Sequence, residues 1–157
     1  MRNMTAGSHI VRRCDIHNCG QTGIVGHLGG VFSTIEDCHI HHINNKQNLA
    51  GAEIGGIKMH AAIDTVIRRC HIHHCTLLAS ETSRLRKWRG LPGVTDACTG
   101  LAGIALEMVD GGVMEKVHVH DITMLHGVQT PILVRLARRS APKPGKTTYL
   151  RDVLIED

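Results

Sequence analysis

Apolar and polar residues alternate along most of this chain, and the alternation comes in two recurring kinds of short segment. The first kind places Cys, Ile or Val at every second position, as in Cys70-His-Ile-His73. We call these the Cys–Ile segments, and they span 10–19, 34–43, 66–75, 113–122 and 149–157. A period of two is typical of β-strands with one buried face, so each of these segments is predicted to be extended.

Segments of the second kind lie between the first and have an isoleucine in third position, in most cases after a glycine. We call these the Gly–Ile segments, and they span 22–27, 55–60, 102–107 and 130–135. The shortest complete repeat, from Cys14 to Cys38, has 24 residues. Longer spacings elsewhere predict insertions at 44–52, 76–99 and 138–147.

A repeat of this length, with short strands and Gly or Asn between them, is typical of a parallel β-helix, in which coils stack about 4.8 Å apart. The prediction is therefore an all-β chain, with one domain over 1–157 and about four to five coils. A leucine-rich-repeat horseshoe is the second choice, but its Leu consensus is missing. A Rossmann-type fold is excluded because the pattern has no amphipathic helices between the strands.

Stacked coils predict columns of equivalent side chains. The expected inward columns are Cys14, Cys38, Cys70, Val117 and Val153, then Ile16, Ile40, Ile72, Val119 and Ile155. The expected outward columns are Asp15, His39, His71 and His118, then His17, His41, His73 and His120. Stacked imidazoles are potential metal ligands. Because we identify no carboxylate or Cys there to complete a coordination set, the prediction is a solvated ladder, with neither metal nor cofactor.

The composition argues against a membrane-spanning protein and against a small disulfide-bonded scaffold. The chain has 157 residues, a formal charge of +4, 17 Gly, 13 His and only three aromatic residues other than His. No apolar run approaches the roughly 20 residues of a membrane span, and residues 1–7 lack the apolar region of a signal peptide. The six cysteines are too sparse for a disulfide scaffold, and we expect them to be free, buried and apolar in character.

The Gly–Ile segments carry the candidate site. Their outward column is expected to be His27, His60, Glu107 and Arg135, with Lys58 on the same face. Variable loops beside this column would form the walls of a groove. An alternative of equal weight is a surface ladder of salt bridges. The predicted catalytic residues are Glu107, Asp110, His60 and Lys58, and the predicted substrate-binding residues are His27, Glu53, Trp88 and Arg135.

Two parts of the chain resemble known families. Gly103–Leu125 and Thr130–Leu136 resemble later coils of polygalacturonase-like proteins of glycoside hydrolase family 28. Gly20–Gly26 and Ala52–Asp64 resemble another group of right-handed β-helix proteins that includes glycosidases. The resemblance implies a right-handed, single-stranded, pectin-lyase-like helix and an extracellular or periplasmic location, although no signal peptide is visible. Because the Asp pair of family 28 is missing, its catalytic carboxylates have no counterpart here.

The predicted function is therefore that of a carbohydrate-active protein, as a glycoside hydrolase on plant or microbial polysaccharide such as an acidic glycan. Hydrolysis usually needs two carboxyl groups; Glu107 would be the general acid, with Asp110 or Glu53 as its partner. A lyase would instead use Lys58 or Arg135 as its base, with His60 assisting.

A non-catalytic sugar-binding or structural fragment is the alternative to both enzymes, so the enzymatic status stays open. Trp88, among four cations, would either stack on a sugar ring or cap the core. The expected partner is a polysaccharide or oligosaccharide. No nucleic acid or membrane is expected as a partner, and uncapped coil ends predict self-association.

Overall fold

The computed structural model describes residues 7–27, 31–46, 54–75, 102–109, 112–125, 130–137 and 148–157. The three predicted insertions lie wholly or largely outside these ranges. The described residues form the strands β1 (Ile10–Arg12), β2 (Asp15–His17), β3 (Thr22–His27), β4 (Thr34–Glu36), β5 (His39–Ile43), β6 (Gly55–His60), β7 (Ile63–Cys75), β8 (Ala102–Val109), β9 (Gly112–Met124), β10 (Thr130–Ala137) and β11 (Thr148–Glu156).

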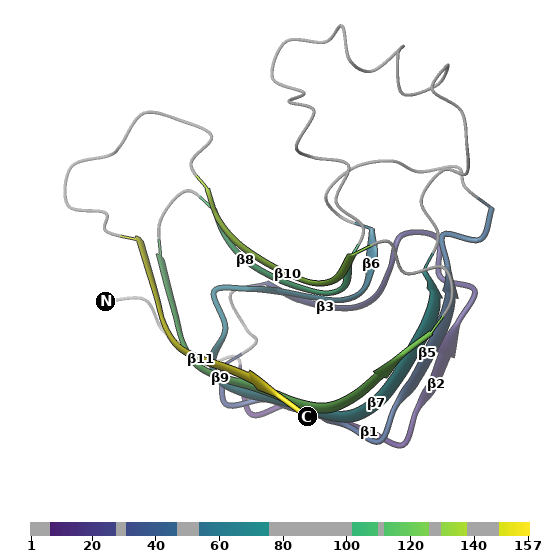
Figure 1. The fold of residues 1–157 in the computed structure, drawn as a ribbon, viewed down its shortest axis with the longest axis horizontal. Helices are drawn as coiled ribbons and strands as arrows, with labels where there is room; N and C mark the ends of the chain where they lie inside the picture. Colours follow the sequence, from purple (N-terminus) through teal and green to yellow (C-terminus); the bar gives the residue numbers. More distant parts are fainter. Residues whose placement is uncertain are drawn as a thin grey trace, which may run out of the picture.

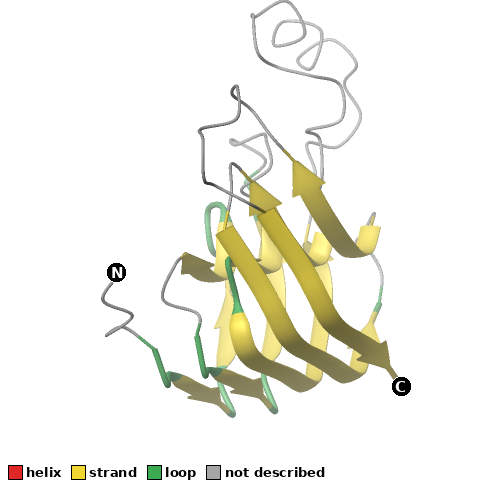
Figure 2. Cartoon of the chain, turned by 90° about the vertical axis from the view of Figure 1, so that its left-hand side faces the viewer, coloured by secondary structure: helices red, strands yellow, loops and turns green. Residues whose placement is uncertain are grey.

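These strands build two sheets, and every strand pair is parallel. The larger sheet holds β1, β2, β4, β5, β7, β9 and β11, and the smaller sheet has the order β10-β8-β6-β3. Seen along the stack, the larger sheet is a curved wall that faces the smaller sheet (Figure 1). From the side, the strands follow one another from the N-terminal to the C-terminal end of the stack (Figure 2). The predicted parallel β-helix is confirmed.

The core lies between the two sheets and consists of stacked aliphatic and thiol side chains. In the first three coils the predicted columns are confirmed, because Ile16 pairs with Ile40 and Ile40 pairs with Ile72. Cys38, Cys70 and Cys75 are buried and free. Burial raises the pKa of Cys75 to about 12, so this thiol is an inert apolar group at neutral pH. The prediction of free, buried cysteines is confirmed for these three, whereas Cys14 and Cys19 are free but only partly buried.

The fourth coil is shifted against the prediction. Cys70 pairs with Ile122, and Val117 pairs with Thr65, so the predicted match of Cys70 with Val117 is wrong by five residues. The predicted match between the last two Cys–Ile segments is correct, because Val117 pairs with Val153.

The five-residue error has a physical cause in the bends of the strands. In β7 the bends are residues in the left-handed conformation, Asp64, Arg69 and His74, with φ of 48°, 48° and 50°. Because they recur every five residues, the buried positions do too. If the register between two strands shifts by five residues, apolar residues therefore still face the core. Matching of the sequence alone does not fix the register. Left-handed residues of successive coils stand side by side in three columns. These are Ser8, Phe32, Asp64, Lys116 and Asp152, then Arg13, Asp37, Arg69 and Asp121, then Asn18, His42 and His74.

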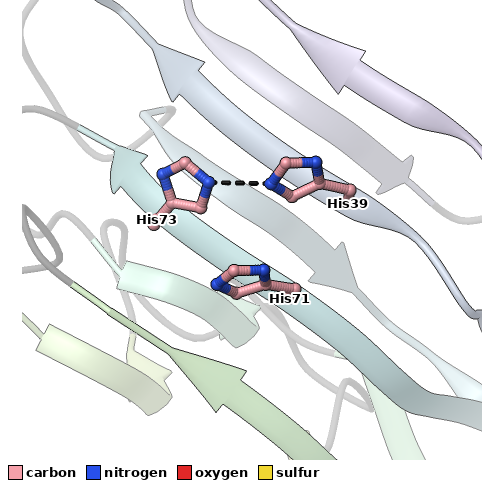
Figure 3. Close-up of side chains that lie close together, drawn as sticks. All are labelled: His39, His71 and His73. Carbon is pink, nitrogen blue, oxygen red and sulfur yellow. Dashed lines mark hydrogen bonds between the residues drawn. The ribbon is translucent and has the colours of Figure 1, made fainter.

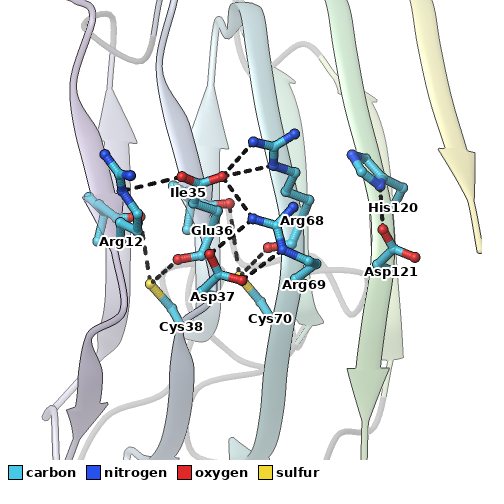
Figure 4. Close-up of polar contacts among 11 residues, drawn as sticks. Arg12, Ile35, Glu36, Asp37, Cys38, Arg68, Arg69, Cys70, His120 and Asp121 are labelled. Carbon is cyan, nitrogen blue, oxygen red and sulfur yellow. Dashed lines mark hydrogen bonds and ion pairs between the residues drawn. The ribbon is translucent and has the colours of Figure 1, made fainter.

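A ladder of ion pairs runs across the first three coils of the larger sheet (Figure 4). The Glu36 carboxylate forms an ion pair with Arg12 of the preceding coil, at 3.3 Å, and with Arg68 of the following coil, at 2.6 Å. Arg69 contacts both Glu36, at 3.0 Å, and Asp37, at 2.7 Å. The hydrogen bond from Arg68 is the main cause that lowers the pKa of Glu36. The ladder therefore helps to hold neighbouring coils in register while Glu36 is ionised.

A column of glycines brings the smaller sheet close to the larger one. A Cβ atom on Gly56 would lie 2.7 Å from the carbonyl oxygen of Gly103 and 2.8 Å from Cγ2 of Ile72. A Cβ atom on Gly23 would meet the Gly56 oxygen at 2.6 Å. These positions need glycine because any side chain would displace the neighbouring coil. Within the described ranges, no helix is long and apolar enough to cross a membrane.

Candidate functional site

The candidate site lies on the face of the smaller sheet that points away from the core. His27 pairs with His60, His60 with Glu107, and Glu107 with Arg135. This register confirms the column predicted from the Gly–Ile segments. The strands alternate, so Met59 and Leu106 face the core while their neighbours His60 and Glu107 face the other way.

A buried ion pair links two of these strands. Lys58 Nζ on β6 lies 3.1 Å from Glu107 Oε2 on β8, with side-chain exposures of 7% and 4%. Arg135 on β10 approaches the other carboxylate oxygen, Oε1, at 3.8 Å and is a quarter exposed. One carboxylate is therefore held by cations from both neighbouring strands. The salt bridges of the alternative interpretation are therefore present, but the Lys58–Glu107 pair is buried and does not lie on the surface.

Burial of this ion pair has an energetic cost, which distinguishes it from an ordinary surface contact. Two charges removed from water lose several kcal/mol of hydration each, and their mutual attraction only approximately compensates. Lysine and glutamate are almost never this deeply buried unless they are paired, which makes the pair a candidate for a functional role. A partly buried imidazole, His60, follows Lys58 on the same face, so four ionisable groups from three strands form one cluster.

Other predicted site residues lie outside the described part of the chain. These are Glu53, Trp88 and Asp110, and only the backbone of His27 is described. The cluster that the structure brings together is Lys58, His60, Glu107 and Arg135.

The larger sheet carries a second cluster, an array of imidazoles on its outward face (Figure 3). His39 pairs with His71 and His41 with His73 on the adjacent strands β5 and β7. The Nε2 atoms of His39 and His73 are 2.7 Å apart. Burial and the neighbouring imidazoles lower the pKa of His73 to about 4. The array is therefore a group of closely packed rings, with His73 neutral at pH 7.

Two sequence predictions about this array are corrected. His118 and His120 do not continue it, because they pair with Val66 and Arg68; Thr123 stands beside His71 instead. A carboxylate does lie within reach, since Asp15 Oδ1 is 2.9 Å from His41 Nε2 and 3.4 Å from His39 Nδ1. The sequence already placed Asp15 in this column, but only the coordinates show how closely the rings approach it.

Comparison with known proteins agrees with this architecture. The family model described as "right handed beta helix region" matches residues 3–130. The chain therefore belongs to the right-handed β-helix family, which confirms the predicted fold and its handedness. None of the curated proteins matches the chain.

A solved structure is also similar, that of XylC in complex with xylose. It shares 34% sequence identity with this chain, at a TM-score of 0.51. The match covers 83% of this chain but only 16% of XylC. XylC thus contains a region like this chain within a much longer protein. The more specific resemblance to glycoside hydrolase family 28 stays a prediction.

Proposed function

We propose that the chain contributes the catalytic face of a glycoside hydrolase, centred on Glu107. The observation that carries the proposal is the buried carboxylate of Glu107, held by Lys58 at 3.1 Å and approached by Arg135 at 3.8 Å. The proposal is supported by the similarity to XylC, whose solved structure contains xylose. We therefore expect a xylose-containing glycoside as the first substrate to test.

The ion pair favours one role for Glu107 over another. Pairing with Lys58 involves the carboxylate form, which acts as a base or a nucleophile and not as a proton donor. We therefore assign Glu107 to activating water or attacking the anomeric carbon, in place of the general-acid role predicted from the sequence. Asp110 or Glu53 would supply the proton to the leaving group.

The neighbours of Glu107 have supporting roles in this proposal. Lys58 fixes the carboxylate through a buried contact, and the partly exposed Arg135 and His60 are suited to bind sugar hydroxyl groups. His27 and Trp88 are proposed as further sugar contacts. A lyase would use Lys58 or Arg135 as its base, but both cations contact the Glu107 carboxylate, at 3.1 Å and 3.8 Å. These contacts therefore favour hydrolysis over elimination.

The test compares two carboxylate replacements in the full chain. Glu107→Gln keeps the shape of the side chain and removes its charge, and turnover of aryl xylosides, xylan and polygalacturonate is measured. We expect a loss of roughly 100-fold or more. The matched control is Glu36→Gln, which also removes a buried, arginine-paired carboxylate, but on the larger sheet. The control is expected to retain turnover.

Two results would contradict this function. Equal turnover by the wild type and Glu107→Gln would remove Glu107 from catalysis. A wild-type chain that binds xylo-oligosaccharides in calorimetry but hydrolyses none would favour the non-catalytic sugar-binding alternative. Where turnover is found, the anomeric configuration of the first product separates the two roles of Glu107, because a nucleophile gives retention and a base gives inversion.

A further inference from the structure

We propose that His39, His71 and His73 together bind one divalent transition-metal ion of the zinc type on the outward face of the larger sheet. One ring nitrogen of each residue lies within 4.8 Å of the other two. His39 and His71 stand side by side on adjacent strands, and His73 is on the same face two residues further along β7 (Figure 3). Imidazole suits zinc, copper and nickel ions. This site is separate from the proposed sugar site on the smaller sheet.

The first pair of ligand atoms is nearly in place. The Nε2 atoms of His39 and His73 are 2.7 Å apart and share one hydrogen bond. In a tetrahedral site with Zn–N bonds of about 2.0–2.1 Å, two nitrogens lie about 3.3 Å apart. A small rotation of the two rings provides this spacing. The metal would take the place of the hydrogen between them, while the ring that donates it moves its N–H to Nδ1.

The opposite ring nitrogens already have partners that suit metal ligands. Nδ1 of His39 lies 3.4 Å from the Asp15 carboxylate, and Nδ1 of His73 contacts Nδ1 of His74. Metal-bound histidines usually donate their other N–H to a carboxylate, a backbone carbonyl or water, which fixes the ring and its tautomer; Asp15 is a partner of this kind. The contact with Asp15 favours the tautomer of His39 that carries its N–H on Nδ1 and leaves Nε2 available to a metal ion.

The third ligand is a ring nitrogen that lacks a hydrogen bond. Nε2 of His71 is shielded from solvent and has no hydrogen-bond partner among the residues that the structure describes. The His71 ring stacks on that of His39 with centroids 5.0 Å apart. A shielded nitrogen without a partner is unfavourable, and a bound metal ion would satisfy it. Three imidazoles would leave one coordination position for water.

A neighbouring set of ligands is the competing choice. Asp15, His39 and His41 also place one ligand atom each within 4.8 Å. There, however, Nε2 of His41 is already paired with Asp15 at 2.9 Å. We therefore assign the ligand role to His71 and His73, and a supporting role to Asp15.

The experiment measures zinc affinity of the full, untagged chain after dialysis against a chelator. Zn²⁺ is titrated in competition with a chromophoric chelator, and Co²⁺ absorption reports the coordination geometry. We expect one ion per chain, and a loss of at least tenfold in affinity for His71→Gln or His73→Gln. Asp15→Asn is expected to weaken binding by roughly tenfold, the usual effect of removing an outer partner. The control is His118→Gln on the same sheet, whose ring bonds to Glu156; it should bind like the wild type.

Three results would overturn the assignment. The first is a wild type that binds Zn²⁺ no more tightly than His71→Gln, and the second is an equal loss in His118→Gln. The third is a loss of binding in His41→Gln but not in His71→Gln, which would move the ion to the competing set. A measurement without variants guards against misfolding: Zn²⁺ should raise the melting temperature of the wild type, and EDTA should reverse the rise. None of these readouts depends on sugar turnover.

Discussion

Lys58 and Glu107 form an ion pair between the adjacent strands β6 and β8 on the face of the smaller sheet opposite the core. Both side chains are more than nine-tenths buried, and their nearest charged atoms are 3.1 Å apart. Their pairing makes each residue dependent on the other, because a single buried charge is far more costly than a buried pair.

The first prediction concerns the stability of this pair. Lys58→Met removes one charge and leaves the Glu107 carboxylate with only the more distant contact to Arg135. We expect the free energy of unfolding to fall by on the order of 3 kcal/mol. The double variant Lys58→Met/Glu107→Leu removes both charges and should recover most of this loss. Urea denaturation followed by circular dichroism measures both, and an equal loss in the two variants would contradict the prediction.

The second prediction concerns the close approach of the coils at the glycine column. Gly56→Ala places a methyl group 2.7 Å from a backbone oxygen of the next coil. We expect a loss of roughly 1–3 kcal/mol in unfolding free energy, the usual cost of overpacking. Gly20→Ala is the matched control, because a Cβ atom there would meet nothing within 4 Å. Similar melting temperatures for the two variants would show that the coils adapt at Gly56.

The third prediction is a loss of stability in acid that depends on Glu36. Its pKa is lowered from the ordinary value of 4.5, chiefly by the hydrogen bond from Arg68. The unfolded chain therefore takes up the proton first, and the stabilisation is present above about pH 4.5 and lost as the pH falls through the lower folded value. Glu36→Gln should make the fall in stability at low pH smaller than in the wild type. Melting temperatures from pH 7 to pH 3 test it, and parallel curves would contradict it.

Local sequence patterns were enough to predict the coils and part of the candidate site. The spacing of the Gly–Ile segments placed His60, Glu107 and Arg135 in one column, as the register confirms. The burial of Glu107 and its contact with Lys58 were not predictable, because they depend on how side chains from neighbouring coils meet. The same holds for the ladder around Glu36, whose partners lie on the coils before and after it.

The imidazole array shows where sequence matching fails. His118 resembles His71 in its local sequence, yet it pairs with Val66, one five-residue step away. The left-handed bends repeat every five residues, so the predicted register and the observed register both place apolar residues of the strand toward the core.

The sequence by itself determined that this protein is a parallel β-helix, because a strand period of two and a 24-residue repeat are local properties of the chain. Only the tertiary structure decided which residues of successive coils stand side by side. That choice depends on contacts between coils, such as the pairing of Cys70 with Ile122, and it places Lys58 against Glu107 and His39 against His73.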